Sequence, residues 1–149
     1  MKPKKVWKVL LACAVAVVGF IMVALLWRHL APQTLSHQLQ TPNGYSPSHA
    51  ALLLLNDGST NSIEFPLTDQ EDVQALWEQL QTTHVRYDRP TDRIPIGERR
   101  YEILLSNSEN GAVPAIYIPC NGYIYMDGIR YTISAAEEQE LICFLEKIQ

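Results

Sequence analysis

The sequence predicts an α+β fold, in which a mostly antiparallel sheet carries two helices and follows an N-terminal transmembrane helix. Three features indicate this: an uncharged apolar run near the N-terminus, short β-rich segments separated by turn dipeptides, and two amphipathic segments that begin with capping sequences. After the membrane helix the predicted order is ββα-β-βββ-α, which favours helices packed on one side of the sheet.

The N-terminal segment is predicted to cross a membrane. Residues 9–27 carry no charge, and a helix of this length rises about 29 Å, close to the hydrocarbon thickness of a bilayer. Trp7 and Trp27 lie at its two ends, as interfacial aromatic residues do. Residues 1–8 contain four lysines, so the positive-inside rule places them in the cytoplasm and the remainder outside. We therefore expect a single-pass signal anchor in the cell membrane.

A cleaved signal peptide and a lipoprotein are the two alternatives, and both would export the same domain. Cleavage after Ala31 would place His29 where signal peptidase requires a small residue. Leu10-Leu11-Ala12-Cys13 resembles a lipobox, but the apolar run continues for 14 residues after Cys13. A small apolar filler of the membrane helix is the favoured interpretation of Cys13, and its lipidation stays an open alternative.

Residues 28–48 are predicted to be a flexible tether. The stretch is rich in Gln, Ser, Thr and Pro and has no usable apolar period. The alternative is a loop packed on the domain, in which Leu35 and Leu39, four residues apart, form a short helix. The extracytoplasmic α+β domain is then expected to comprise residues 49–149.

The first half of this domain is predicted to form two strands and a helix. Residues 51–55 are an unbroken apolar run, which indicates a strand buried on both faces, and Asn56-Asp57-Gly58 favours a turn. Apolar residues alternate over residues 63–67, as in a second strand. Thr68-Asp69-Gln70-Glu71 has the pattern of a capping box, and the helix that follows is expected to end near Thr82.

The second half is predicted to form the rest of the sheet and the last helix. A charged segment, residues 83–100, is expected to hold a short strand and a loop, and further strands are predicted at 101–105, 113–120, 123–126 and 129–134. Asn121-Gly122 and Asp127-Gly128 are favoured in two-residue hairpin turns. Ser134-Ala135-Ala136-Glu137 has the second capping-box pattern.

Asp88-Arg89-Pro90 before a strand, the aromatic segments 122–125 and 128–133, and the N-terminal anchor together form a pattern. Over roughly residues 50–149, this pattern resembles small membrane- or lipid-anchored extracytoplasmic domains of unknown function from Gram-positive bacteria. The resemblance implies the location of the domain and assigns no functional residue.

Charge and motifs limit the chemistry that we expect. From Arg28 onward the chain carries 8 basic and 16 acidic residues, a net charge of −8, which repels phosphate backbones and argues against nucleic-acid binding. The four histidines lack ligand spacing, and the sequence contains no glycine-rich phosphate loop or nucleophile elbow. We therefore expect no catalytic residue, metal or cofactor, with a zinc site assembled from distant residues as an open alternative.

Two groups of residues are candidates for recognition. The first is a cluster of arginines that could bind carboxylate or phosphate: Arg86, Arg89, Arg93, Arg99 and Arg100. Because Asp88, Asp92 and Glu98 are interleaved with them, local ion pairs on a solvated loop are the favoured interpretation.

The second group follows from the two hairpin turns, which would fix the strand register. Cys120 would oppose Tyr123, Ile118 would oppose Tyr125, and Met126 would oppose Ile129. The face opposite the core would then hold a possible partner-binding set: Ile116, Ile118, Tyr123, Tyr125 and Arg130. Cover by the second helix or the N-terminal hairpin is the favoured interpretation of this apolar face, and a partner-binding patch is the alternative.

Cys120 and Cys143 are predicted to be free thiols. An oxidising compartment permits a disulfide, but the register turns Cys120 away from the core face that the last helix is expected to cover. A helix usually packs near 10 Å from a sheet, whereas a disulfide needs Cα atoms within about 7 Å.

The leading functional hypothesis is a non-enzymatic module that binds a protein or envelope component, in sensing or regulation. An envelope hydrolase with a dispersed site is one alternative. A structural subunit of a membrane complex is another, since Ala12 and Ala16 permit close helix packing.

Overall fold

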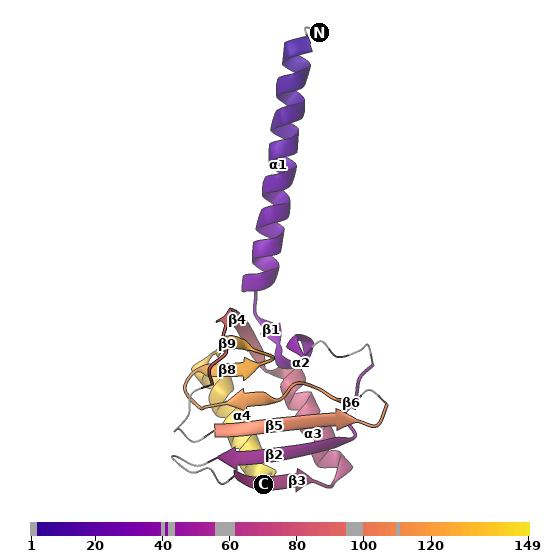
Figure 1. Cartoon of the computed structure of the whole chain (residues 1–149), viewed down its shortest axis with the longest axis vertical. Coiled ribbons are helices and arrows are strands. Elements are labelled where there is room, and N and C mark those ends of the chain that lie inside the picture. The colour runs from indigo at the N-terminus through magenta and orange to yellow at the C-terminus, as the bar shows by residue number, and fades with distance from the viewer. Residues whose placement is uncertain (1–2, 40, 42–43, 56–61, 95–99, 110) are drawn as a thin grey trace. The chain divides into compact units, whose positions relative to one another are not determined.

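The computed structural model describes residues 3–39, 41, 44–55, 62–94, 100–109 and 111–149, which divide into two compact units, Met1–Ala31 and Pro32–Gln149 (Figure 1). The first unit is helix α1 (Pro3–Leu30), which contains the predicted span. Its segment Leu10–Trp27 has a mean hydropathy of 2.8 and is exposed throughout. By length and composition α1 is therefore a membrane anchor or a secretion signal.

The second unit is built on a nine-stranded antiparallel sheet, counted over the described residues, in the order β1-β4-β9-β8-β7-β5-β2-β3, with β6 paired to β5. The strands are β1 (Gln33–Thr34), β2 (His49–Leu55), β3 (Ser62–Leu67), β4 (His84–Pro90), β5 (Arg100–Asn107), β6 (Gly111–Ala112), β7 (Ile116–Ile118), β8 (Tyr123–Met126) and β9 (Ile129–Ile133). The helices of this unit are α2 (Leu35–Gln38), α3 (Gln70–Thr82) and α4 (Ala135–Lys147). The predicted α+β class is confirmed.

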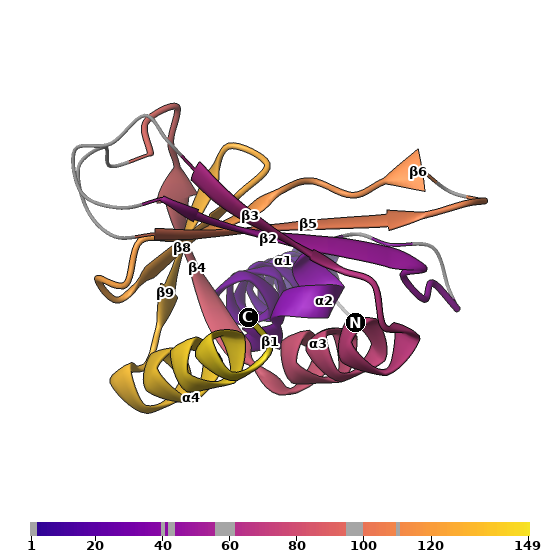
Figure 2. The same cartoon turned by 90° about the horizontal axis from the view of Figure 1, so that it is seen from below.

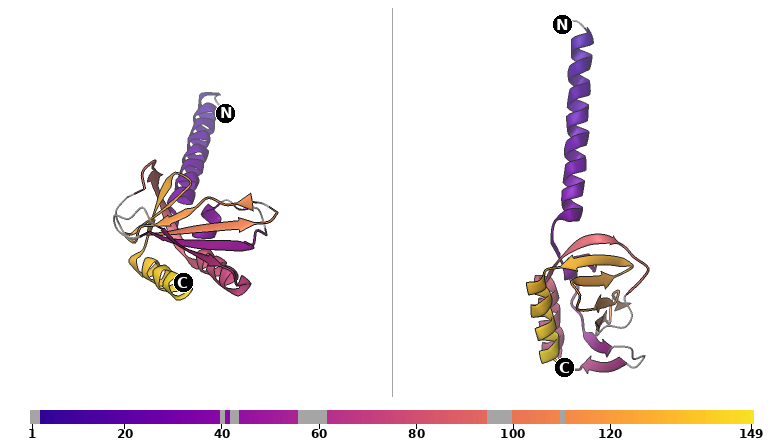
Figure 3. Two further views of the ribbon diagram at one scale, coloured as in Figure 1. Left: turned by 60° about the horizontal axis from the view of Figure 1, so that its bottom comes forward. Right: turned by 90° about the vertical axis from the view of Figure 1, so that its left-hand side faces the viewer.

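All three helices of this unit lie on one face of the sheet, which we call the inner face (Figures 2 and 3). Apolar side chains of the central strands point to this face and meet the apolar sides of the helices. The buried core includes Leu52, Ile103, Ile116, Ile124 and Tyr131 from the strands, with Leu76, Trp77, Leu80, Leu141 and Leu145 from α3 and α4. The opposite face, which we call the outer face, carries no helix of this unit in the described part of the chain.

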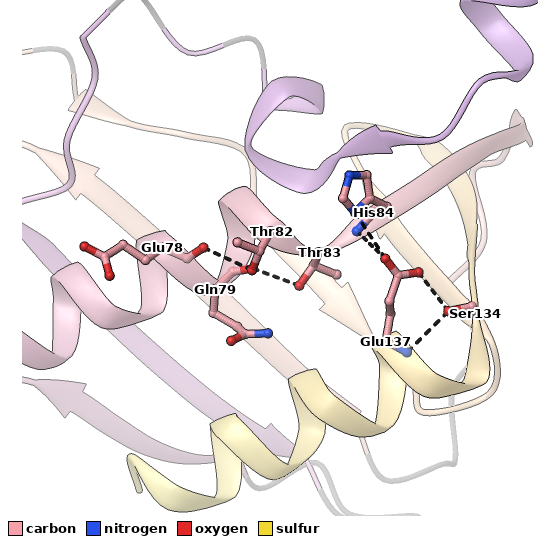
Figure 4. Close-up of polar contacts among 7 residues, drawn as sticks. All are labelled: Glu78, Gln79, Thr82, Thr83, His84, Ser134 and Glu137. Carbon is pink, nitrogen blue, oxygen red and sulfur yellow. Dashed lines mark hydrogen bonds and ion pairs between the residues drawn. The ribbon is translucent and has the colours of Figure 1, made fainter.

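The junction between α3, β4 and α4 is fixed by polar caps (Figure 4). The Thr83 hydroxyl donates to the Gln79 carbonyl at 2.8 Å where α3 ends. Ser134 caps α4 as predicted, since its Oγ accepts from the Glu137 amide at 3.3 Å. The Glu137 carboxylate also accepts from the His84 amide at 3.0 Å, which ties the start of α4 to the start of β4.

The cap of α3 differs from the prediction by one residue. Asp69, not Thr68, is the N-cap, and its carboxylate accepts from the Glu71 amide at 2.9 Å. Asp is among the preferred N-cap residues, and a carboxylate there also benefits from the positive end of the helix dipole.

The tether prediction for residues 28–48 is wrong from Pro32 onward, where the folded unit begins. Gln33 and Thr34 form β1, which pairs with the start of β4. Leu35, Leu39 and Tyr45 are buried in the core, and the Tyr45 ring meets Trp77 edge to face at 5.4 Å. The packed loop with a short helix is therefore the correct alternative, because tertiary contacts order a segment that has no apolar period of its own.

The predicted register of β7 against β8 is wrong by one residue. Ile116 pairs with Met126 and Tyr117 with Tyr125, whereas two-residue closure at Asn121-Gly122 would have paired Ile118 with Tyr125. Pro119 has no amide to donate to the ladder, which favours opening the hairpin earlier. A contact with α4 stabilises the turn instead, because the Gly122 amide donates to the Glu138 carboxylate at 2.8 Å.

The next hairpin follows the prediction. Met126 pairs with Ile129, and Asp127 and Gly128 form the turn with positive φ angles of 48° and 70°. Two successive positive φ angles are typical of the type I′ turn that the Asp-Gly dipeptide favours.

Cys120 and Cys143 carry thiols and no disulfide, as predicted. Cys143 lies on the exposed side of α4, where its sulfur accepts from the Gln139 side chain at 3.2 Å. Cys120 lies in the turn between β7 and β8 and packs partly against the core.

Candidate functional site

A row of directly paired side chains crosses the outer face from one strand to the next. Cross-strand partners share a face of a sheet, so the pairing of six strands places their side chains side by side. In spatial order the row is Leu53 (β2), Glu102 (β5), Tyr117 (β7), Tyr125 (β8), Arg130 (β9) and Arg89 (β4). It runs from an apolar residue and a carboxylate, through two tyrosines, to two arginines.

This row forms part of the wall of a hollow of about 930 Å³, which we call the outer-face cavity. Its volume lies in the upper part of the range that small-molecule sites occupy. Five strands and the segment after β4 contribute to it, and the lining residues are Arg89, Thr91, Asp92, Arg93, Ile94, Arg100, Glu102, Tyr117, Tyr125 and Arg130. A smaller depression of about 390 Å³ is lined by residues of α3 alone, so it lacks converging elements.

Positive charge gathers in the outer-face cavity although the domain is acidic. Four arginines and two carboxylates line it, a net charge of +2, which becomes +1 when Asp88, the ion-pair partner of Arg130, is counted. The chain from Arg28 onward has a net charge of −8. Half of the eight basic residues in that part of the chain therefore lie at one site. Such a local reversal of sign favours an anionic ligand.

Arg130 is held in a defined position. Its guanidinium forms an ion pair with Asp88, donates a hydrogen bond from Nε to the same carboxylate, and lies 4.4 Å from the centroid of the Tyr123 ring. Hydrogen bonding to Asp88 is the main cause that raises the pKa of Arg130. Asp88 reaches this position because a shift in the β4–β9 register falls between Tyr87 and Arg89.

The other half of the row pairs a phenol with a carboxylate. Burial raises the pKa of Tyr117, and the neighbouring Glu102 raises it further through its charge and through a hydrogen bond that the phenol donates. The positive charge of Arg100 acts in the opposite direction. The Tyr117 hydroxyl, which lines the cavity, therefore keeps its proton to a higher pH than an ordinary tyrosine does.

The free energy of unfolding is expected to fall as the pH rises above about 10. Tyr45, Tyr117 and Tyr131 each have a pKa raised in the folded state, mainly by burial. A raised pKa means that these phenols lose their protons at a lower pH in the unfolded chain than in the folded one. Their contribution to the free energy of unfolding is therefore complete below the pKa of the unfolded chain, and it is lost as the pH rises through the pKa values of the folded state. Urea unfolding between pH 8 and 11.5 measures this, and Tyr117→Phe should reduce the slope. An unchanged slope in that variant would contradict the role of Tyr117.

The structure divides the face that the sequence predicted. Ile116 and Ile118 are fully buried on the inner face, so they are not part of a partner-binding face. Tyr123, Tyr125 and Arg130 lie on the outer face as predicted. The cover that was favoured for this face is not found among the described helices and strands, because α4 and the β2–β3 hairpin do not lie over it.

The arginine cluster is partly assembled at the same place. Arg89, Arg93 and Arg100 line the cavity, Arg86 is exposed on β4 outside it, and Arg99 lies outside the described residues. One ion pair of the kind expected within the cluster is formed among the described residues: the Arg89 Nε lies 3.9 Å from the Asp88 carboxylate. The closer partner of Asp88 is Arg130, which comes from another strand.

Sequence reasoning missed Tyr117, Glu102 and Asp88 as site residues. Pro119 is the one sequence feature that could have indicated that Tyr117 lies on the outer face, because a proline beside the turn argues against strand pairing up to the Asn121-Gly122 turn.

Among the described residues, no group of three or more His, Cys, Asp or Glu side chains could hold a metal ion. No protein-family model matches the chain, and neither the curated proteins nor the solved structures contain a significant match.

Proposed function

We propose that this chain is a single-pass, signal-anchored membrane protein whose extracytoplasmic domain binds a ligand in the outer-face cavity, as a binding or sensing module. The observation that carries the proposal is the convergence of four arginines and two tyrosines, from five strands and the segment after β4, on a face that carries none of the described helices. Arginine and tyrosine are the side chains most used for recognition, because they combine a large planar surface with directional hydrogen bonds.

The orientation is supported by the charges around α1. Lys2, Lys4, Lys5 and Lys8 precede the apolar segment, while Arg28 alone follows it closely. This asymmetry favours a cytoplasmic N-terminus and an extracytoplasmic domain. The exposed apolar surface of Leu10–Trp27 supports insertion in a bilayer.

A reporter enzyme that is active only in the cytoplasm, fused after Gln149, is expected to be inactive. The same reporter joined before Met1 is the matched control and should be active, because that end is expected to stay inside. Activity of the C-terminal fusion would show that the domain faces the cytoplasm, and immunoblotting for the intact fusion would show that α1 is retained.

Site-specific photocrosslinking in the native membrane tests the ligand site. A benzophenone amino acid at Thr91, on the wall of the cavity, is expected to give a defined crosslinked product. The same residue at Gln81, on the exposed side of α3, is the control and should give none. Equal products from both positions, or none from Thr91, would contradict a ligand site in the outer-face cavity.

A further inference from the structure

We infer that the ligand of the outer-face cavity carries one singly charged oxyanion, a carboxylate or a phosphodiester, on an aromatic or other flat apolar body. The oxyanion binds at the end of the cavity formed by β4, β9 and the segment after β4, and the body lies over the two tyrosines. This ligand class rests on the binding site proposed above. It follows from the distribution of charge along the cavity, from the two arginines that are available to a ligand, and from the tyrosines.

The positive charge of the cavity is concentrated at one end. Three arginines come from β4, β9 and the segment after β4: Arg89, Arg130 and Arg93. Two carboxylates of the same part of the chain, Asp88 and Asp92, reduce their charge to a net +1. One singly charged oxyanion neutralises this end.

The other end of the cavity has no net charge. Arg100 and Glu102 both come from β5, two residues apart on the outer face, so their charges compensate each other. Arg100 already has a partner and its Nε is buried, so we assign it no contact with the ligand. A second anionic group would therefore meet no uncompensated positive charge at this end.

Arg89 and Arg93 are the guanidinium groups available to a ligand. The Arg89 side chain is 64% exposed, and its Nε lies 3.9 Å from Asp88, beyond hydrogen-bond distance. Arg93 is exposed, and within the described part of the chain it forms no ion pair. Arg130, by contrast, is bound to Asp88 and acts as a fixed positive charge. The oxygen atoms of one carboxylate or phosphodiester suffice to accept from both available groups.

The segment that carries these two arginines is anchored to the β8–β9 turn. The Thr91 amide donates to the Gly128 carbonyl at 2.8 Å, and the Thr91 hydroxyl oxygen accepts from the Arg93 amide at 3.3 Å. Thr91 lies two residues after Arg89 and two before Arg93, so these bonds hold the backbone between them. A held backbone reduces the entropy that is lost when both side chains bind one ligand.

The two tyrosines form a floor that favours an aromatic body. Tyr125 is only 5% exposed and Tyr117 is half-buried, and both line the cavity. A flat apolar group that stacks on such rings gains contact area with little loss of hydration. Ile94 adds an apolar side chain to the wall, and a volume of about 930 Å³ exceeds what an inorganic ion fills. The ligand is therefore an organic acid with a ring or a similar flat group.

Ligand-observed NMR on the full-length chain, in nanodiscs of zwitterionic lipid, tests this with matched probes. Phenylacetate and methyl phenyl phosphate carry one charge on an aromatic body. Their neutral matches are phenylacetamide and dimethyl phenyl phosphate, and acetate and dimethyl phosphate are the head groups alone. Empty nanodiscs correct for partition of the probes into lipid. At least one charged aromatic probe is expected to bind about fivefold or more tightly than its neutral match and than its head group. The two series distinguish carboxylate from phosphodiester.

A longer pair of probes tests the number of anionic groups. Biphenyl-4,4′-diacetate has a carboxylate at each end, whereas biphenyl-4-acetate has one. The doubly charged probe is expected to bind no more than about twofold more tightly, the factor that two equivalent ends give by themselves, because the β5 end offers no uncompensated charge.

Four variants locate the oxyanion. Arg89→Gln and Arg93→Gln should each weaken binding of the charged probe about threefold or more and leave that of its neutral match unchanged. Asp92→Asn should strengthen binding of the charged probe about threefold, because it removes a negative charge from the same end. Arg86→Gln is the matched control, since Arg86 is exposed on β4 outside the cavity, and its effect should stay below about twofold.

The opposing outcomes are separable. Equal affinity for the charged and neutral probes of both series would overturn the oxyanion, and equal affinity for the aromatic probes and their head groups would overturn the body. A biphenyl diacetate that binds about tenfold more tightly than the monoacetate would overturn the single charge. A loss in Arg86→Gln as large as in Arg93→Gln would show diffuse attraction of anions and would also overturn the inference. Failure of all probes, combined with a crosslink from Thr91, would overturn the ligand class alone, whereas failure of both experiments would overturn the proposed function as well.

Discussion

Leu35→Ala is expected to lower the free energy of unfolding of the domain by about 2–5 kcal/mol. Leu35 is fully buried, and its amide donates to the Thr83 carbonyl at 2.9 Å. Truncation to alanine removes buried apolar surface and leaves a cavity between α2, α3 and the sheet, which a packed interior fills only in part. Urea or thermal unfolding followed by near-ultraviolet circular dichroism measures the loss.

Leu104→Ala is the matched control for that variant, because Leu104 is 37% exposed on the outer face and its truncation should cost less than about 1 kcal/mol. Two shortened chains extend the test to the whole segment. A chain that starts at Pro32 should fold, and one that starts at Ser48 should be much less stable, because it lacks β1, α2 and the buried Tyr45. Equal stability of the two chains would show that residues 32–47 are a tether after all.

Sequence patterns predicted those elements of the fold whose signal lies within the element's own residues. The strands at β2, β5, β8 and β9 and the helices α3 and α4 each have a full period of apolar residues or a turn dipeptide of their own. Residues 33–39 have neither, since a strand of two residues and a helix of four cannot show a period. Their structure depends on contacts with Thr83 and Val85, which lie about 50 residues further along the chain.

The site depends even more on distant pairing. Arg89 and Arg130 were placed in separate groups, and only the β4–β9 pairing brings them together. Asp88 reaches Arg130 through an irregularity of that pairing, for which the sequence carries no distinct pattern. A strand that was expected to be buried on both faces, β2, instead alternates between buried and half-buried residues from Ala50 onward, because the helices that the structure describes in this unit all lie on the inner face.

The register of β7 decides which isoleucines belong to the core, and Ile118→Ala tests it. With Ile118 opposite Tyr125, as the turn dipeptide suggested, this side chain would lie on the outer face and its truncation would cost little. In the structure Ile118 is fully buried and pairs with Tyr101 of β5. We therefore expect Ile118→Ala to lower the free energy of unfolding by about 2–5 kcal/mol.

Ile63→Ala is the matched control, because Ile63 is the same residue type at 48% exposure on the edge strand β3, and we expect a cost below about 1 kcal/mol. Tyr117→Phe completes the comparison from the other face. It keeps the ring and removes only the hydroxyl that donates to Glu102, so it should change the high-pH behaviour and ligand binding while stability at neutral pH changes little. If Ile118→Ala were as mild as Ile63→Ala, Ile118 would belong to the outer face. Tyr117 would then lie in the core, and the outer-face cavity would lose the centre of its floor.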